Sequence, residues 1–290
     1  ITNIDREHME SYGTWDNLQE AFVEFANKVP FYGAVVACID DAPVRALLPR
    51  FTRRVITYAL DRDADVTGSE MRLLPFGSET RIRVKQPDGS AQDAGVLHLK
   101  VPGRHNVLNA LGAIAVGLEV AIPFNRLSAA LEAFQGAERR FQTRGEAGGV
   151  MVVDDYGHHP TEIAAVIAAA RAGIDRRIVA VFQPHRYSRT EQLLNDFGPA
   201  FAGADAVVLT EIYAAGEKPI PGITGAALAD AVRRAVNVPV EFVPAFDDLA
   251  ATVAGLTRAG DLVLTLGAGS IGTIGDRILD TIRARQEGTR

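Results

Sequence analysis

Two carboxylates and two imidazoles crowd into the short segment 154–159, which reads Asp-Asp-Tyr-Gly-His-His. An apolar run at residues 150–153 precedes this segment, and Pro160 follows it at the start of a stretch with helical spacing. Proline suits the first turn of a helix because its φ is fixed near the helical value and its missing N–H is not needed there. The pattern therefore predicts a strand, a loop with reactive side chains and a helix.

Such a loop can bind a metal ion, hold a phosphate or ribose, or move protons. A plainer interpretation is that Asp154 or Asp155 caps the helix and that His158 and His159 are surface residues. Each residue taken alone favours the plainer interpretation. Taken together at the end of a strand they favour a functional site, because ligands of open α/β sheets bind at the carboxyl ends of the strands.

A second polar segment follows the apolar run at residues 178–182. It contains His185, Arg186 and Arg189, and the two arginines are three positions apart where we expect a helix to start, so they can point the same way. Two forked guanidinium groups suit a carboxylate or a phosphate. Because arginine at a helix N-terminus opposes the helix dipole, we favour anion binding over a solvated surface pair.

Three glycines within residues 267–272 match the dinucleotide-binding pattern. That pattern belongs to a first βαβ unit, with an acidic residue on the next strand about 20 positions later. No further strand is expected after residue 272. We interpret the glycines as a tight turn that lets the backbone approach a substrate, and a nicotinamide oxidoreductase is the rival interpretation.

Three smaller patterns are weak on their own. His105, Asn106 and Asn109 open a helix and can hold a purine or ribose, although Asn106 can also be an N-cap. His8 follows an apparent strand beside acidic residues and can ligate a divalent metal ion. Arg140 lies at an expected domain boundary, from which it can reach a phosphate or remain in a solvated linker.

Composition excludes several classes of protein. Hydrophobic residues make up 47% and charged residues 23% of the 290 positions, as in an ordinary globular protein. The net charge of −6 and the lack of a long basic run argue against nucleic acid as a partner. A single cysteine, Cys38, suits a reducing cytoplasm, and no apolar run approaches the length needed to span a membrane.

The elements that must position these residues differ between the two halves of the chain. The second half alternates strands with helices, which predicts a parallel, doubly wound sheet. Its expected strands are residues 150–153, 178–182, 206–209, 240–243 and 262–266, and its expected helices are residues 160–172, 189–202, 225–236 and 247–258. The polar segments that follow these strands should then meet at one edge of the sheet.

The first half is mixed. Residues 55–101 contain short alternating runs around the turn sequence at residues 87–90, which predicts an antiparallel, hairpin-rich layer. Helices are expected at residues 15–26, 43–48, 107–120 and 125–134. The boundary between the halves falls in a stretch rich in glycine and charge, at residues 135–149.

Several of these segments together resemble the Mur ligases. Residues 153–162 and 182–190 resemble the C-terminal domain of that family. Other motifs fall in the family's order, at residues 3–12, 30–33, 102–106, 136–141 and 267–272. The resemblance covers essentially the whole chain and is strongest to the ligases that attach L-alanine. It implies an α/β protein with part of a central ATPase domain (1–137) followed by a Rossmann-like, doubly wound, amino-acid-binding domain (138–290).

The resemblance also implies a reaction and its participants. ATP would phosphorylate UDP-N-acetylmuramate, with Mg²⁺ as cofactor, and L-alanine would attack the acyl phosphate in cytoplasmic peptidoglycan precursor synthesis. The nucleotide contacts would be His105, Asn106, Asn109, Arg140, Asp155 and Tyr156. The catalytic and amino-acid contacts would be His158, His185, Arg186 and Arg189. His8 would ligate magnesium. Only small-molecule partners are implied, with a homodimer compatible.

The sequence departs from the family in one respect. Mur ligases open their central domain with a phosphate-binding loop ending in Gly-Lys-Thr, and no such pattern occurs in these 290 residues. We therefore expect that an N-terminal portion is missing, that the chain starts inside the central domain and that it is inactive alone. Two rivals remain besides the oxidoreductase: a sister ligase that attaches a recycled tripeptide to the same sugar, and a non-catalytic nucleotide-binding module.

Overall fold

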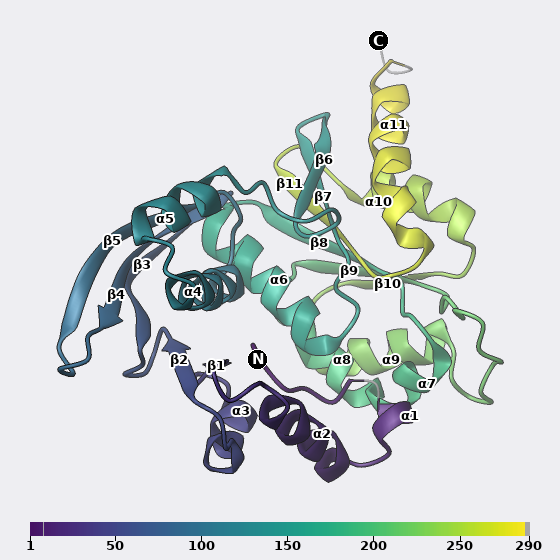
Figure 1. The fold of residues 1–290 in the computed structure, drawn as a ribbon. Coiled ribbons are helices and arrows are strands. Elements are labelled where there is room, and N and C mark those ends of the chain that lie inside the picture. The colour runs from purple at the N-terminus through teal and green to yellow at the C-terminus, as the bar shows by residue number, and fades with distance from the viewer. Residues whose placement is uncertain (8, 288–290) are drawn as a thin grey trace. The chain divides into compact units, whose positions relative to one another are not determined.

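A computed structural model describes residues 1–7 and 9–287 of the chain (Figure 1). The chain divides into two compact units, Ile1–Gln135 (unit 1) and Gly136–Arg290 (unit 2). Each unit combines a sheet with helices and contains its own buried clusters of apolar side chains. The α/β fold expected from the alternation of elements is confirmed.

Unit 2 is built on a six-stranded sheet in the order β10-β9-β8-β11-β7-β6. Its strands are β6 (Gln142–Ala147), β7 (Val150–Asp155), β8 (Arg177–Phe182), β9 (Ala206–Thr210), β10 (Val240–Val243) and β11 (Asp261–Leu266). All neighbouring pairs are parallel except β6 with β7. The predicted doubly wound sheet is therefore present, with one additional antiparallel edge strand.

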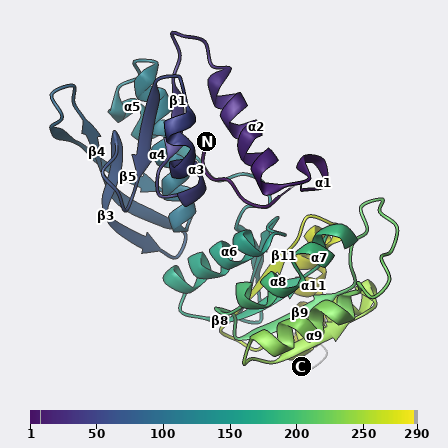
Figure 2. The same cartoon turned by 90° about the horizontal axis from the view of Figure 1, so that it is seen from below.

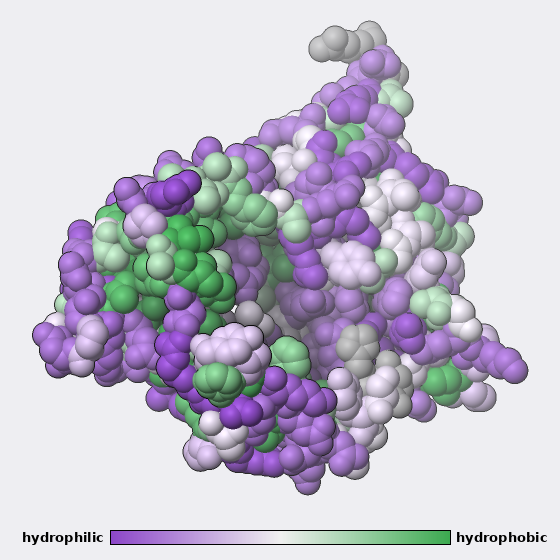
Figure 3. Space-filling view, in the orientation of Figure 1, coloured by the Kyte–Doolittle hydropathy of each residue, from purple (hydrophilic) through white to green (hydrophobic). Residues whose placement is uncertain are grey.

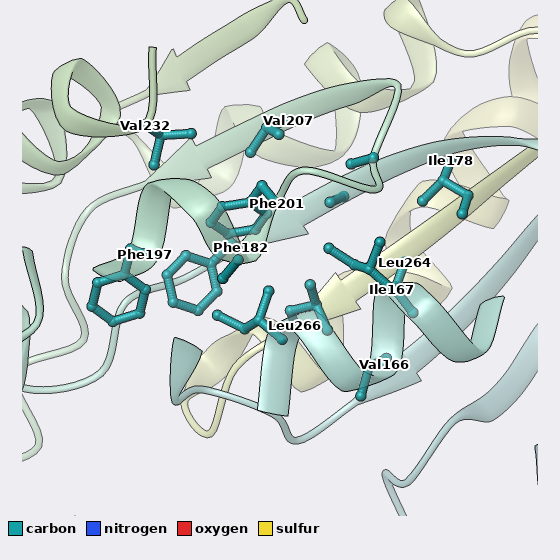
Figure 4. Close-up of a cluster of buried hydrophobic side chains, with 14 of the residues drawn as sticks. Val166, Ile167, Ile178, Phe182, Phe197, Phe201, Val207, Val232, Leu264 and Leu266 are labelled. Carbon is teal, nitrogen blue, oxygen red and sulfur yellow. The ribbon is translucent and has the colours of Figure 1, made fainter. Parts of the chain in front are cut away.

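Helices cover both faces of this sheet (Figures 1 and 2). They are α6 (Pro160–Gly173), α7 (Tyr187–Gln192), α8 (Leu194–Ala200), α9 (Gly225–Ala235), α10 (Leu249–Leu256) and α11 (Ile274–Glu287). Side chains of α6, α8 and α9 pack on one face, where Phe182, Phe197 and Phe201 lie together (Figure 4). Side chains of α10 and α11 pack on the other face. Burial on both faces explains why the inner strands β8, β9 and β11 are almost continuously apolar.

The register places the ends of the parallel strands at one level. Leu266 of β11 lies opposite both Asp155 of β7 and Phe182 of β8, and Phe182 lies opposite Leu209 of β9. The loops that follow these four strands therefore leave the sheet at the same edge. The expectation that the polar segments share one edge is confirmed.

Unit 1 has a five-stranded sheet in the order β1-β2-β3-β4-β5. Its strands are β1 (Val35–Cys38), β2 (Val55–Ala59), β3 (Val66–Leu74), β4 (Gly77–Lys85) and β5 (Ala91–Leu99). The β3-β4-β5 layer is antiparallel, as predicted. The assignment of residues 55–60 to that layer is wrong, because β2 pairs in parallel with both β1 and β3. A short strand with mixed burial carries no signal that tells parallel from antiparallel pairing.

The helices of unit 1 are α1 (Met9–Tyr12), α2 (Trp15–Asn27), α3 (Ala42–Leu47), α4 (Arg104–Glu119) and α5 (Phe124–Ala133). Local capping sets two of their starts: the Thr14 hydroxyl accepts from Asn17 N, and the Asp41 carboxylate accepts from Val44 N. Apolar residues exposed near α4 and α5 include Val116, Val120 and Phe134. A hydrophobic patch over these helices is visible in Figure 3.

Two features of unit 2 were not predicted from the sequence. The glycine-rich and charged stretch 135–149 contains β6, whose polar residues pair through the backbone at the edge of the sheet. The single helix expected at residues 189–202 is two helices, because Leu193 leaves the helical conformation with φ −112° and ψ 15°. Neither glycine nor proline occurs at this break, so the sequence gives no sign of it.

The first residues of the chain lie along β1. Ile1 donates its amino group to Val36 O and accepts from Cys38 N, and Ile4 is buried. The apparent strand expected before His8 thus appears as backbone pairing of Ile1 with β1, without a regular strand. No helix in the described part of the chain is both long and apolar enough to cross a membrane.

Candidate functional site

The two aspartates at the end of β7 are structural acceptors. Asp154 is 1% exposed and accepts from Arg139 Nε at 2.8 Å and from Thr265 Oγ1 at 2.7 Å. Asp155 is 2% exposed and accepts from two backbone groups, Phe141 N and Gly157 N, both at 2.7 Å. Burial raises the pKa of Asp155, although the two backbone donors oppose this. Neither aspartate caps α6, so that alternative is wrong.

His159 and Glu162 form the cap of α6. His159 is the N-cap residue, and its Nδ1 accepts from Thr161 N at 3.4 Å. Glu162 Oε2 accepts from His159 N at 3.2 Å and from His158 N at 3.0 Å. This reciprocal capping satisfies backbone donors at the start of the helix and fixes the loop that carries the histidines.

His158 and His185 lie next to each other at this edge, with ring centroids 5.6 Å apart. Nδ1 of His158 lies 3.0 Å from the carbonyl of Tyr156. A carbonyl only accepts, so Nδ1 must donate, and Nε2 is the proton-accepting nitrogen of the neutral ring. His158 therefore has the tautomer that a general base needs.

His185 has the opposite tautomer. Its Nδ1 lies 3.3 Å from Nη1 of Arg189, which can only donate, so Nε2 of His185 carries the proton. Burial, followed by the nearby charges of His158, Arg189 and Arg186, lowers the pKa of His185 to about 4. Its ring stacks on Tyr213, with centroids 5.5 Å apart and planes at 13°. His185 is therefore a neutral hydrogen-bond donor.

The arginines of the second segment are arranged differently from the expectation that they share a helical turn. Arg186 lies before α7 with a positive φ of 73°, and only Arg189 lies within the helix. Arg186 Nη1 is 3.5 Å from Glu217 Oε1, whereas Arg189 contacts His185. A left-handed arginine is sterically costly, which is typical of strained positions at functional sites.

Arg139 and Arg140 both approach the ring of Tyr156. Their guanidinium carbons lie 5.2 Å and 5.6 Å from its centroid. Arg139 is held by Asp154 and donates to Gly267 O at 2.7 Å. Arg140 is about half exposed and lies 3.5 Å from Glu162. Arg140, the basic residue expected at the boundary, thus presents its charge to solvent, whereas its neighbour Arg139 is a structural residue.

The glycines at 267–272 make room for the protein's own side chains. A Cβ on Gly269 would lie 2.6 Å from Tyr213 Cγ, and one on Gly272 would lie 2.5 Å from Cζ of Arg139. Gly267 has a φ of 139°. The segment passes from β11 into a 3-10 turn and then into α11. The tight turn is as expected, but the close approach is made to Tyr213 and Arg139.

The nucleotide-contact candidates of unit 1 lie at the start of α4. The helix begins at Arg104 with Gly103 as its N-cap, so the alternative that Asn106 caps it is wrong. The Asn106 side-chain NH₂ group donates to Pro102 O at 2.7 Å, so the Asn106 side-chain oxygen takes no part in that bond. His105 and Asn109 share this first part of the helix, and Asn109 is exposed.

The proposed magnesium ligand, His8, lies outside the described residues. Among residues 1–7 and 9–287, no three histidine, cysteine, aspartate or glutamate side chains are grouped as a metal ion would need.

Sequence reasoning missed two residues that the structure places at the site. Tyr213 and Glu217 lie in the loop after β9 and contact His185 and Arg186. The sequence signal was limited to a polar segment after an apolar run, which did not distinguish these two residues from their neighbours.

Comparison with known proteins identifies the family of the chain. Residues 1–117 match the Mur ligase middle domain, and residues 139–269 match the Mur ligase glutamate ligase domain. The chain belongs to the Mur ligase family, of which it carries the middle and C-terminal domains. This result removes the nicotinamide oxidoreductase as an interpretation of the glycine-rich turn.

Two relatives are UDP-N-acetylmuramate–L-alanine ligases. That of Solibacter usitatus is 46% identical over 288 residues, covering 99% of this chain and 60% of the relative. That of Nitratidesulfovibrio vulgaris is 49% identical over 282 residues, covering 96% of this chain and 60% of the relative. The chain thus spans about 60% of the length of these curated relatives.

Solved structures give the same result for the fold. The UDP-N-acetylmuramate-alanine ligase of Thermotoga maritima aligns with a TM-score of 0.76 at 26% identity, covering all of this chain and 59% of that one. A murein peptide ligase of Psychrobacter arcticus aligns with a TM-score of 0.67 at 19% identity, covering 98% of this chain and 57% of that one. The second likeness concerns the fold alone.

Proposed function

We propose that this segment is the nucleotide-binding and amino-acid-binding part of a ligase that joins L-alanine to UDP-N-acetylmuramate in peptidoglycan precursor synthesis. ATP would activate the muramoyl carboxylate as an acyl phosphate, which the alanine amine attacks. The names and high identity of the relatives support this substrate pair. The observation that carries the proposal is the cluster of His158, His185, Arg186 and Arg189 at the carboxyl edge of unit 2.

The arginines suit the carboxylate of the amino acid. Arg186 is partly exposed at this edge, and Arg189 lies beside His185. Nε2–H of His185 adds a neutral donor. When guanidinium groups hold the carboxylate of an amino acid, its amine is held in a defined position as well. This positioning is the main contribution that a ligase can make to amide formation.

His158 suits the role of proton acceptor. Its Nε2 is the acceptor nitrogen of the neutral ring, and the loop that carries it is fixed by the α6 cap. An amine that attacks an acyl phosphate must lose protons on the way to the amide. We infer that His158 takes one of them, while the donors on His185 and the arginines stabilise negative charge.

We infer that each unit, described by itself, carries candidate nucleotide contacts. In unit 2, Arg140 presents a half-exposed guanidinium beside Tyr156, which fits a phosphate, whereas Asp155 acts indirectly by holding the loop. In unit 1, His105, Asn106 and Asn109 offer ring and amide groups for a purine or ribose. Mg²⁺, with His8 as a ligand, would neutralise phosphate charge in this reaction.

The test of the amino-acid site uses a full-length ligase that contains this segment. Arg186→Ala should raise the KM for L-alanine by about tenfold to a hundredfold while leaving the KM for ATP nearly unchanged, as expected for the loss of a charge-assisted hydrogen bond. Arg171→Ala, on the far end of α6, is the control. An unchanged KM for L-alanine in the Arg186 variant would refute the assignment.

We infer as well that these 290 residues do not turn over alone, because they contain no sequence for a phosphate-binding loop. Phosphate release with UDP-N-acetylmuramate, ATP and L-alanine should be at background for the segment and robust for a longer protein that includes the loop. Equal rates would show that the loop is dispensable.

A further inference from the structure

We propose that Glu217 is a positioning residue that sets the affinity of the site for its amino acid by holding Arg186. This inference rests on the proposed function, because it assigns Arg186 to the substrate carboxylate. Glu217 lies in the loop between β9 and α9, about thirty positions after Arg186, and nothing in its local sequence marks it as part of the site.

Both oxygens of Glu217 are engaged by the loop that carries the arginines. Oε2 accepts from Ser188 N at 3.0 Å, and Oε1 accepts from Ser188 Oγ at 2.7 Å. Oε1 also lies 3.5 Å from Nη1 of Arg186. One carboxylate therefore satisfies a backbone donor in the first turn of α7 and pairs with the arginine that precedes this helix.

The backbone reinforces the same junction. Arg186 N donates to Tyr213 O at 2.9 Å, and Tyr213 N donates to Pro184 O at 2.8 Å. These two bonds form an isolated parallel β-bridge between His185 and Tyr213, and the rings of the same two residues stack on each other. The loop after β9 and the loop after β8 are thus joined on both sides of Arg186, by backbone at Tyr213 and by side chain at Glu217.

A strained turn presents Glu217 to this junction. Ala215 and Gly216 have φ values of 49° and 85°, and Glu217 N donates to Ala214 O at 3.0 Å. Two consecutive positive φ values with this bond are typical of a type I′ turn. Alanine is disfavoured in the left-handed region, so the turn persists because its surroundings hold it.

The pKa of Glu217 agrees with a carboxylate that is held by hydrogen bonds and by a neighbouring cation. Burial acts to raise the pKa of Glu217, but hydrogen bonds from Ser188 and the charge of Arg186 outweigh it and hold the pKa below its usual value. Glu217 is therefore ionised near neutral pH. Without it, Arg186 would keep its left-handed backbone but lose the contact that restricts its long side chain, and the side chain would adopt several rotamers.

The experiment is a double-mutant cycle in the full-length ligase. Glu217→Gln keeps the size of the side chain and removes the charge, and Arg186→Ala removes the proposed substrate contact. We expect Glu217→Gln to raise the KM for L-alanine by about tenfold, with the KM for ATP within about twofold of the parent. The double variant should have the KM of Arg186→Ala alone, because a positioning residue has no effect once its target is gone.

Two further variants keep the test decisive. Glu191→Gln changes an exposed glutamate on α7 and is the matched control, which should leave the KM for L-alanine unchanged. Ser188→Ala removes only the hydroxyl contact of Glu217 and serves if the Glu217 variant does not fold. Its KM for L-alanine should rise by less than that of Glu217→Gln.

The outcomes separate this inference from the proposed function. If Arg186→Ala raises the KM but Glu217→Gln and Ser188→Ala do not, Glu217 is not a positioning residue. The same conclusion follows if the effects of Arg186 and Glu217 multiply in the double variant, or if Glu217→Gln lowers kcat and the melting temperature without a selective change in KM. If Arg186→Ala itself has no effect on the KM, the proposed amino-acid site is wrong.

Discussion

Arg139 and Asp154 form an ion pair in which the carboxylate is 1% exposed and the guanidinium 22% exposed, with Nε and Oδ2 2.8 Å apart. The same guanidinium donates to Gly267 O. Through this one side chain the segment before β6, the end of β7 and the turn after β11 are joined. The pair therefore belongs to the scaffold of the site, although the sequence places Arg139 beside a proposed nucleotide contact.

The first prediction concerns this pair. Arg139→Ala leaves the Asp154 carboxylate buried without its cation, so the free energy of unfolding should fall by about 3–5 kcal/mol. The measurement is urea unfolding followed by circular dichroism. Arg283→Ala breaks an exposed pair with Asp280 and should cost less than about 1 kcal/mol. Equal losses in the two variants would contradict the structural role of Arg139.

The second prediction concerns Asp155. Its two oxygens accept from Phe141 N and Gly157 N. Asparagine has one acceptor oxygen and would turn an NH₂ group toward one of these donors, so Asp155→Asn should lower the free energy of unfolding by about 1–3 kcal/mol. Urea unfolding again provides the measurement. A variant as stable as the parent would show that the loop does not depend on these bonds.

The third prediction separates crowding from backbone strain. Gly269→Ala would place a Cβ 2.6 Å from Tyr213 Cγ, which should displace the ring from His185 and raise the KM for L-alanine in a full-length ligase. Gly222→Ala meets no atom within 4 Å but has a φ of 83°, so it should cost only about 1–2 kcal/mol of stability. A KM equal in both variants would argue against a role for the Tyr213 stack.

Neither variant nor parent should bind NADH saturably.

The fourth prediction concerns pH. The pKa of His185 is lowered to about 4 in the folded protein, mainly by burial and then by the charges of His158 and the arginines. The unfolded chain has a histidine pKa near 6.5, so between about pH 4 and 6.5 it binds more protons than the native state. His185 therefore makes the free energy of unfolding rise with pH across this window, with its full contribution present above it.

His185→Gln should flatten that rise. The measurement is the free energy of unfolding at several pH values from 4 to 8, for the parent and the variant. His98→Gln, on the exposed face of β5, is the matched substitution outside the candidate site. If the His185 variant retained the whole slope, other groups would account for it.

The sequence predicted the strands, loops and helices at the carboxyl edge of unit 2 well. The spacing of apolar residues and the residues that end each run are both local signals. The strand before Asp154 and the helix after Pro160 follow from an apolar run and a proline. The parallel register that brings His158 beside His185 follows from the alternation of elements. These features can be predicted without knowing which side chains contact one another.

What the sequence did not predict depends on long-range contacts. Arg186 lies outside α7 with a φ of 73°, where its backbone N–H donates to the carbonyl of Tyr213, a residue distant in the sequence. β6 pairs through its backbone and therefore leaves little trace in side-chain pattern. The difference in role between Arg139 and Arg140 arises from Asp154 and Gly267, which are distant in the sequence.

The place of β11 in the sheet has a consequence for how the protein is made. β11 is the last strand of unit 2 in the sequence but lies between β7 and β8, and the bond from Thr265 to Asp154 spans 111 positions. As the chain emerges from the ribosome, the backbone groups of β7 and β8 that face β11 stay unpaired until this strand inserts between them. The reactive edge is therefore assembled last, by the arrival of a strand that itself contains no histidine or arginine.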